Sequence, residues 1–236
     1  MASARRGGVL RWVAWTLGAL ALALVLLQAW YAAHILWWRD HPVGETSFMA
    51  YRMDELHAKN PKAPLRYAWV PYERISNNLK RAMIAAEDAK FVEHEGFDWE
   101  GIQHALDKNW KRGKTVAGGS TITQQLAKNL FLSPSKNYLR KGEEALITLM
   151  LESSMDKERI LELYLNVIEW GSGVFGAEAA AQRYFGVHAS DLTAEQSARL
   201  ASMAPNPRFY ERNPGAPGLM KKIGIIRARM GSAELP

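Results

Sequence analysis

The 236-residue sequence contains no cysteine. This absence excludes a disulfide framework, a cysteine-based metal site and a thiol nucleophile, although it does not indicate a cellular compartment. The ten prolines and eighteen glycines are too few for a low-complexity or collagen-like chain. The length suffices for one domain of ordinary size with an appendage, but not for two large catalytic domains. We therefore expect one packed core and one main activity.

Charged side chains are missing from a long stretch near the N-terminus. Residues 12–38 contain no Asp, Glu, Lys or Arg, and five of the nine tryptophans lie near the two ends of this stretch. A membrane-spanning helix needs about 20 apolar residues, and tryptophan is enriched where such a helix meets the headgroups. We expect a retained transmembrane helix over residues 12–38 rather than a cleaved signal peptide, whose apolar core is usually about 7–15 residues.

Half of the net charge of +6 lies before this apolar stretch. Arg5, Arg6 and Arg11 precede it without any acid, which leaves 27 basic and 24 acidic residues for the rest of the chain. The positive-inside rule then predicts that residues 1–11 are cytoplasmic and that the remainder of the chain after the span lies outside the cytoplasm. Because the excess charge orients the anchor, it does not indicate a nucleic-acid partner, and we expect none.

Helical spacing dominates the rest of the sequence. We expect a stalk at 39–64, punctuated by prolines and holding one short helix near 51–58, a mainly α domain at 65–215, and a C-terminal helix or tail at 216–236. Capping residues and apolar stripes predict helices over 77–89, 99–110, 133–153 and 160–168, and another between the Thr193–Gln196 capping box and Pro205. No segment shows strand alternation of useful length.

Charges of opposite sign are separated along the domain. Residues 87–107 contain seven acids and one base, whereas residues 108–142 contain eight bases and no acid. One interpretation is two solvated faces, with the basic one attracted to anionic lipid. The other is a site in which a carboxylate handles a proton while cations hold a phosphate.

Two glutamates are the candidates for that carboxylate. Glu87 continues the helical face of Leu79 and Met83, so its carboxyl group is expected to lie against apolar neighbours, which would raise its pKa. The alternative is an ordinary surface glutamate. Glu144 follows Arg140 by one helical turn. Its alternative interpretation is a helical ion pair worth about 0.3 kcal/mol.

Four further patterns have limited specificity. The segment Gly118–Gln125 suits phosphate oxygens or sugar hydroxyls, although a Gly-Gly turn with a serine cap explains it as simply. Lys114 belongs to no Walker A loop, and the Ser133–Lys136 match to S-x-x-K lacks its companion motifs. The six histidines show no metal-ligand spacing, so we interpret His94 as a structural hydrogen-bonding residue rather than a metal ligand.

Four motifs within residues 87–166 resemble the peptidoglycan glycosyltransferases, glycosyltransferase family 51, and most closely its monofunctional biosynthetic members. The motifs are Glu87-Asp88-x-x-Phe91-x-x-His94-x-Gly96, Gly119-Ser120-Thr121-Ile122-Thr123-Gln124-Gln125-Leu126-x-Lys128-Asn129, Arg140-Lys141-x-x-Glu144, and Lys157-x-x-Ile160-Leu161-Glu162-x-Tyr164-Leu165-Asn166. They follow the order of the family, and the resemblance covers roughly residues 65–215. The N-terminal anchor agrees with it.

The resemblance implies a lysozyme-like α fold that polymerises lipid II into glycan strands and releases undecaprenyl pyrophosphate with inversion. It implies that Glu87 takes the proton from the acceptor hydroxyl and that Glu144 assists as a second catalytic carboxylate near the leaving group. The substrate-binding residues that it implies are Asp88, His94, Ser120, Thr121, Thr123, Gln124, Gln125, Lys128, Asn129, Arg140, Lys141, Lys157, Tyr164 and Asn166.

The resemblance also implies partners and a cofactor. The partners are lipid II, the growing lipid-linked strand, the membrane, and transpeptidases or other cell-wall and division proteins. The family can use a divalent cation, Mg²⁺ or Mn²⁺, at the pyrophosphate, which no ligand spacing here supports independently. A lysozyme-like glycan-cleaving enzyme and a non-catalytic membrane-anchored scaffold remain as alternatives. The basic segment 108–141 favours the polymerase over cleavage, because cleaving an uncharged glycosidic bond leaves no pyrophosphate to neutralise.

Overall fold

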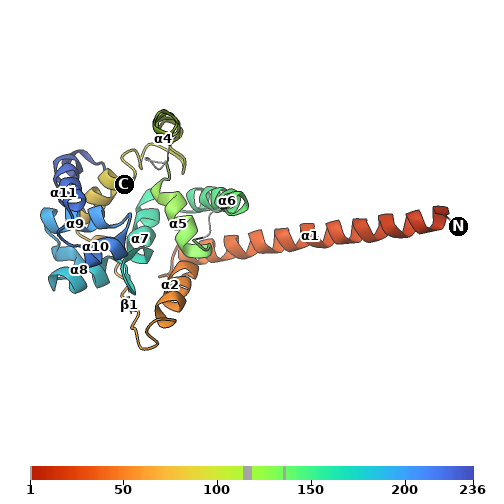
Figure 1. Ribbon diagram of the computed structural model, residues 1–236, viewed down its shortest axis with the longest axis horizontal. Helices are drawn as coiled ribbons and strands as arrows, with labels where there is room; N and C mark the ends of the chain where they lie inside the picture. The colour runs from red at the N-terminus through yellow and green to blue at the C-terminus, as the bar shows by residue number, and fades with distance from the viewer. Residues whose placement is uncertain (1, 114–118, 135–136) are drawn as a thin grey trace. The chain divides into compact units, whose positions relative to one another are not determined.

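The computed structural model describes residues 2–113, 119–134 and 137–236, which form two compact units, Met1–Asp40 and His41–Pro236 (Figure 1). Several residues that the sequence patterns single out lie outside the described residues, namely Lys114, Gly118 and Lys136. The side chains of Arg5 and Arg6 are also outside the description. Each unit is described below by itself.

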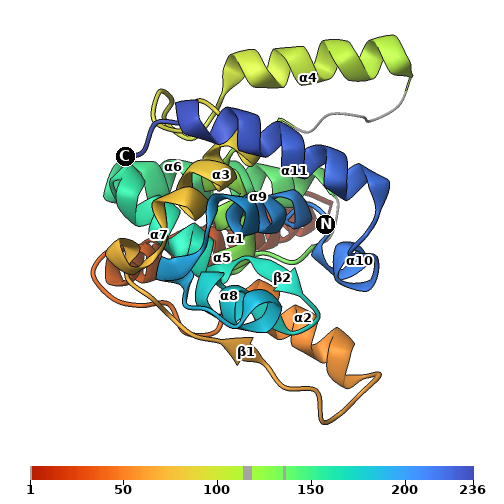
Figure 2. The same cartoon turned by 90° about the vertical axis from the view of Figure 1, so that its left-hand side faces the viewer.

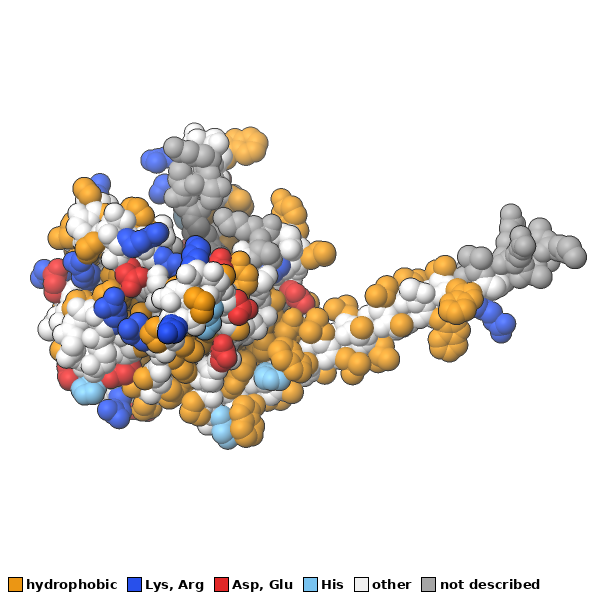
Figure 3. Space-filling model, turned by 60° about the horizontal axis from the view of Figure 1, so that its bottom comes forward, with side chains coloured by type: hydrophobic (Ala, Val, Ile, Leu, Met, Phe, Trp, Pro, Cys, Tyr) orange, Lys and Arg blue, Asp and Glu red, His pale blue; other side chains and the backbone are white. Residues whose placement is uncertain are grey.

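The first unit is a single helix, α1 (Ala2–Trp38). Its stretch Arg11–Trp38 is long and apolar enough to cross a membrane, in agreement with the span predicted over 12–38. Hydrophobic side chains cover it along its length (Figure 3). The one-turn spacing lets the Thr16 hydroxyl donate to the Trp12 carbonyl, so this polar side chain is satisfied inside the helix.

The second unit begins with the segment that we expected to be a stalk, and here the structure differs. Within residues 39–64, α2 (Ser47–His57) is an ordered helix that packs against α5. The Thr46 side chain caps it, and Phe48 and Met49 are buried. The prolines therefore end local elements without separating them from the core, because the apolar face of α2 is buried against the domain.

Helices build most of this unit, so the prediction of a mainly α domain is confirmed. After the 3₁₀ turn η1 (Tyr72–Arg74), the helices are α3 (Asn77–Glu87), α4 (Trp99–Arg112), α5 (Ile122–Phe131), α6 (Tyr138–Ser154), α7 (Lys157–Val167), α8 (Ala177–Phe185), α9 (Ala194–Met203), α10 (Pro207–Arg212) and α11 (Pro217–Arg229), with further 3₁₀ turns η2 (Ala189–Asp191) and η3 (Met230–Ser232). Figure 2 shows α3, α9 and α11 side by side, and these three helices are in mutual contact. Every residue of 160–167 is buried, so α7 is the central helix.

The helix boundaries follow local capping chemistry. The predicted capping box of Thr193 and Gln196 opens α9, and α4 ends at Gly113, whose φ of 61° is left-handed. Two starts differ from the prediction. Ser76 caps α3 in place of an asparagine, and Asn137 caps α6 in place of Ser133, since each of these side chains accepts a hydrogen bond from the first turn.

A small sheet that the sequence analysis did not predict joins distant segments. Strand β3 (Val174–Phe175) pairs in parallel with β1 (Arg66–Tyr67) and antiparallel with β2 (Glu169–Gly171), which gives the order β1-β3-β2. Strands of two or three residues are too short to show an alternating pattern. The sheet nevertheless joins the segment before η1 to the segment that follows α7.

Candidate active site

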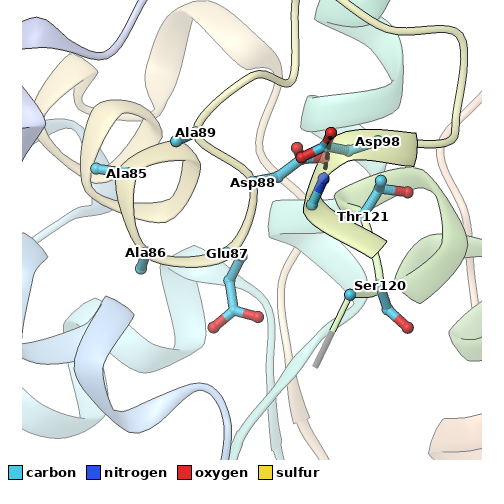
Figure 4. A pocket seen from close by; sticks show the side chains of 10 residues that line it. Ala85, Ala86, Glu87, Asp88, Ala89, Asp98, Ser120 and Thr121 are labelled. Atoms are coloured by element: carbon cyan, nitrogen blue, oxygen red, sulfur yellow. Dashed lines mark hydrogen bonds between the residues drawn. The ribbon is translucent and has the colours of Figure 1, made fainter. Parts of the chain in front are cut away.

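The last residue of α3, Glu87, lies in a cavity of the second unit. Asp98, Ser120 and Thr121 also line this cavity. Figure 4 shows the Glu87 carboxylate and the Ser120 side chain directed toward the same open region, whereas Asp88 turns toward Asp98 and Thr121. One carboxylate is thus presented to a ligand while its neighbour in sequence faces the protein.

A hydrogen-bond relay holds the Glu87 carboxylate. The Gln125 amide nitrogen on α5 donates to Glu87 Oε2 at 2.8 Å, and the buried Tyr164 hydroxyl on α7 donates to Gln125 Oε1 at 3.1 Å. Burial raises the pKa of Tyr164 well above its ordinary value, so its hydroxyl stays protonated and orients the amide. Gln125 is therefore held with its N–H groups toward the glutamate.

Burial also raises the pKa of Glu87, as the sequence predicted. Leu79 and Met83 are fully buried on the same face of α3. The Gln125 hydrogen bond and the positive charges of Lys222 and Lys128 oppose the effect of burial. A carboxylate with a raised pKa accepts a proton more readily, which suits a general base.

Asp88 supports the site through hydrogen bonds to other parts of the protein. Its Oδ2 accepts from the Ile122 backbone N–H in the first turn of α5, and its Oδ1 lies 2.9 Å from His94 Nε2. His94 Nδ1 accepts from the Gly96 N–H at 3.1 Å, so the hydrogen on this ring lies at Nε2 and is donated to Asp88. Asp88 and His94 thus join the end of α3 to the start of α5, and the interpretation of His94 as a structural residue agrees with this geometry.

The second predicted carboxylate, Glu144, is buried on α6 and carries two cations. Arg140 Nη1 lies 2.6 Å from Glu144 Oε2, and Lys141 pairs with the other carboxylate oxygen. The Lys141 ammonium also donates to the Ser120 hydroxyl at 3.4 Å. A second cavity lined by Ser120 and Lys141 therefore adjoins the Glu87 cavity. Glu144 fixes these cations at one end of the site.

Lys128 is the third cation, one helical turn after Gln125 on α5. Its ammonium is half-buried, and burial lowers its pKa. Within the described part of the chain, no oxygen accepts a hydrogen bond from this ammonium. A partly desolvated cation without an anion is a favourable place for a negatively charged ligand.

Three other predicted residues are engaged in holding helices. Thr121 and Gln124 form the capping box of α5, and the Thr121 hydroxyl also donates to the Gly96 carbonyl at 2.7 Å. The fully buried Asn166 spans to Val70, with its amide both donating to and accepting from the Val70 backbone. These polar side chains are occupied by the protein, so the structure places them in the framework around the site.

The remaining predicted residues also divide into those that contact other protein side chains and those that line a cavity. The Thr123 hydroxyl and the Lys157 ammonium both donate to Glu152 Oε1, at 2.5 and 2.8 Å, and Lys157 also lies 4.8 Å from the ring centroid of Phe91. Asn129 instead lines a third cavity with Gln125 and Lys128. Lys157 and Thr123 therefore form a pair with Glu152 and do not join the cations near Glu87.

Two contributions escaped the sequence analysis. Lys222 on α11 lies close enough to Glu87 to lower its pKa, yet it is an exposed residue beside the buried stripe of Leu219 and Ile223 and outside every motif. The third cavity includes Arg52 and Glu169, which are more than 100 residues apart in the sequence. Only the packing of the domain brings these residues to the site.

The comparisons with known proteins agree with this geometry. A family model described as Transglycosylase matches residues 54–230, which extends beyond the expected 65–215 at both ends. The biosynthetic peptidoglycan transglycosylase of Dechloromonas aromatica (strain RCB) is 60% identical over 226 residues, covering 96% of this chain and 98% of the relative. The proteins of the same name from Janthinobacterium sp. (strain Marseille) and Methylobacillus flagellatus (strain ATCC 51484 / DSM 6875 / VKM B-1610 / KT) are 59% and 61% identical, covering 94% and 92% of this chain and 96% and 95% of the relatives. Because the family model matches most of the chain and the relatives are similar over nearly their full length, the chain belongs to the transglycosylase family.

Proposed function

We propose that the protein is a peptidoglycan glycosyltransferase that polymerises lipid II into glycan strands. The observation that carries the proposal is that Gln125 on α5 holds the partly buried carboxylate of Glu87, and that Lys128, one turn later on α5, has no hydrogen-bond acceptor among the described residues. The name shared by its relatives, biosynthetic peptidoglycan transglycosylase, supports the substrate class.

Glu87 acts as the general base in this proposal. Its carboxylate takes the proton from the 4-hydroxyl of the acceptor sugar, and that oxygen attacks the anomeric carbon of the growing chain. The bond from the anomeric carbon to the pyrophosphate oxygen breaks, its electron pair leaves with undecaprenyl pyrophosphate, and the anomeric centre inverts. Gln125 and Tyr164 hold the carboxylate in place during the attack.

The cations stabilise the leaving group. Negative charge accumulates on the departing pyrophosphate, and cations already in position lower the energy of that transition state. No oxygen of the described residues accepts a hydrogen bond from the Lys128 ammonium, while Arg140 and Lys141 are fixed by Glu144. In this proposal Glu144 assists by positioning the two cations on α6, and Ser120 adds a hydroxyl beside Lys141.

A divalent cation at the pyrophosphate belongs to the same proposal. Among the described residues there is no group of three or more His, Asp or Glu side chains that would hold a metal by itself. Mg²⁺ commonly uses only one or two carboxylates together with phosphate oxygens, and the cavity offers Asp98 in addition to Glu87, which is needed free as the base. Asp98 would share the ion with the substrate, and the ion would neutralise pyrophosphate charge.

The proposed site of action is the outer face of the inner membrane. Helix α1 supplies the anchor, and the arginines before it place the N-terminus in the cytoplasm by the positive-inside rule. In the second unit, α6 exposes Tyr138, Leu139, Leu146 and Leu149 on its outer side, an apolar surface suited to lipid. The glycan strand would then be passed to transpeptidases and other cell-wall or division proteins.

Incubation of the full-length protein with lipid II in detergent, followed by gel separation of the glycans, tests this function. We expect a ladder of long strands that depends on protein and time. Shortening of preformed glycan strands would instead identify a cleaving enzyme. Loss of the substrate without polymer, or no reaction with either material, would contradict the proposal and favour the scaffold.

A further inference from the structure

Helix α2 contributes one wall of the third cavity, next to the predicted reaction centre. Phe48 and Arg52, one turn apart on this helix, line the cavity together with Gln125, Lys128 and Tyr164. Both α2 residues precede residue 54, where the match to the family model begins. The cavity wall therefore includes side chains that neither the motifs nor the family match assigned to the site.

The Phe48 ring contacts two cations. Lys128 Nζ lies 5.7 Å from the ring centroid, and the Arg52 guanidinium carbon lies 4.9 Å from it. The ring is buried, with a relative exposure of 8%. A cation within about 6 Å of an aromatic face is attracted by the ring quadrupole, and the attraction strengthens when water is excluded.

Arg52 is itself fixed by a closed set of ion pairs. It lies 2.7 Å from Glu55 and 3.1 Å from Glu169, while Arg208 lies 3.1 Å from Glu55 and 2.6 Å from the other oxygen of Glu169. These four residues come from α2, β2 and α10. Because two arginines alternate with two carboxylates, α2 cannot shift without breaking partly buried pairs.

We propose that Phe48 is a positioning residue for Lys128 and that α2 thereby contributes to the function of the active site. This inference rests on the proposed function, because Lys128 is the cation assigned there to the leaving group. The ring is the part of the α2 surface that contacts the ammonium, and it leaves the N–H groups of Lys128 available for an anion. An aliphatic side chain of similar volume would fill the space without attracting the charge.

The first test compares Phe48→Leu with Phe48→Tyr in lipid II polymerisation. We expect Phe48→Leu to lower kcat/KM about tenfold, mainly through kcat, and Phe48→Tyr, which keeps the ring, to remain within about twofold of the natural protein. Tyr72→Leu is the matched control. Lys80 Nζ lies 3.5 Å from the centroid of the Tyr72 ring, so this ring also attracts an ammonium, but Tyr72 lines none of the three cavities. This variant is expected to lower thermal stability while leaving kcat/KM within about twofold.

The second test measures the Lys128 ammonium directly and needs no activity. In the full-length protein carrying ¹³C-dimethylated lysines, the Lys128 signal is identified by its loss in Lys128→Arg and followed by NMR through a pH titration. Groups other than the Phe48 ring that influence this titration are Arg52 on α2, Glu87 on α3, Arg140, Lys141 and Glu144 on α6, Tyr164 on α7 and Glu169 on β2. We expect the Lys128 pKa to fall further in Phe48→Leu and to stay unchanged in Phe48→Tyr and Tyr72→Leu.

The outcomes separate this inference from the proposed function. An unchanged Lys128 pKa in folded Phe48→Leu, or equal impairment in Phe48→Leu and Phe48→Tyr, overturns the positioning role even if the natural protein polymerises lipid II. A natural protein that makes no polymer overturns the proposed function, while the titration still decides whether Phe48 holds Lys128. If Phe48→Leu fails to fold, Phe48→Tyr must still keep both activity and titration for the inference to stand.

Discussion

The two glutamates of the site have opposite surroundings. Glu87 ends α3, and its carboxylate accepts a hydrogen bond from a neutral amide, that of Gln125. Glu144 lies within α6, is 3% exposed, and has a cation on each carboxylate oxygen. The first environment disfavours the charged form, because burial raises the pKa of Glu87. The second environment provides the opposite charges that a buried carboxylate needs.

This difference separates two uses of one residue type. A carboxylate whose charged form is destabilised by burial accepts a proton readily. A carboxylate paired with two cations instead keeps those cations in position. Equal behaviour of the two residues on substitution would contradict the distinction.

Replacement of Glu87 by glutamine should have the largest effect. The amide is almost isosteric but cannot accept the proton, so we expect polymerisation to fall by at least about 10³-fold while the fold is retained. Rates of strand formation from lipid II, with circular dichroism to verify folding, provide the measurement. Glu95→Gln, which removes a nearby exposed acid, is the control and should keep near-natural activity. Substantial turnover by folded Glu87→Gln would remove Glu87 from its role.

Replacement of Glu144 by glutamine should reduce the rate by about 100-fold. The cations on α6 would lose their common anion and leave their positions beside Ser120. Because the base is untouched, the pH dependence of the residual activity should keep the acidic limb of the natural protein. Glu158→Gln, at an exposed position of α7, is the control. A shifted acidic limb in Glu144→Gln would show that this carboxylate also titrates in the reaction.

The two basic surfaces should differ by about tenfold. Lys141→Ala removes a cation that contacts Glu144 and Ser120, whereas Lys111→Ala removes an exposed lysine of α4. We expect kcat/KM for lipid II to fall about tenfold in the first variant and to change less than twofold in the second. Equal losses would indicate that the basic segment acts only by general attraction to the membrane.

The smallest effect is a pair of stability changes with opposite signs. A raised pKa means that folded Glu87 is destabilising when charged, from about its ordinary value of 4.5 upward, and that this cost disappears as the pH falls below that value. Glu87→Gln should therefore raise the melting temperature at pH 7 and have little effect at pH 4. Glu144→Gln should lower stability at pH 7, by about 1 kcal/mol, because it leaves a partly buried Arg140 without its anion. Calorimetry that gave shifts of the same sign would break the comparison.

Sequence patterns anticipated the local parts of this site and missed the distant ones. The Leu79, Met83 and Glu87 spacing predicted burial of the carboxyl group, and the Arg140 to Glu144 spacing predicted the ion pair, since both depend on one helix. The pair of Lys141 with Glu144 also lies within that helix, although we did not predict it. Short-range geometry determines all of these contacts.

The missed features depend on contacts between segments far apart in the chain. The link from Tyr164 through Gln125 to Glu87 joins three helices, and no periodicity of one helix indicates which side chains meet. The stalk prediction relied on prolines, yet burial of Phe48 against the domain outweighed them. The sequence motif likewise did not distinguish side chains that face a ligand from those, such as Asn166, whose hydrogen bonds hold the framework.

Gln125 and Lys128 lie on one rigid helix, so α5 sets the spacing between two parts of the reaction. Their three-residue separation corresponds to about 4.5 Å along the helix axis, so the distance between the group that holds the base and the cation for the leaving group is built into the backbone. Asp88 fixes the start of α5 relative to the end of α3, because its carboxylate accepts a hydrogen bond from the Ile122 N–H in the first turn of α5. One residue deleted between Gln125 and Lys128 would place the lysine about 200° around the helix from Gln125, on the opposite face, and so separate the two halves of the chemistry without changing any catalytic side chain.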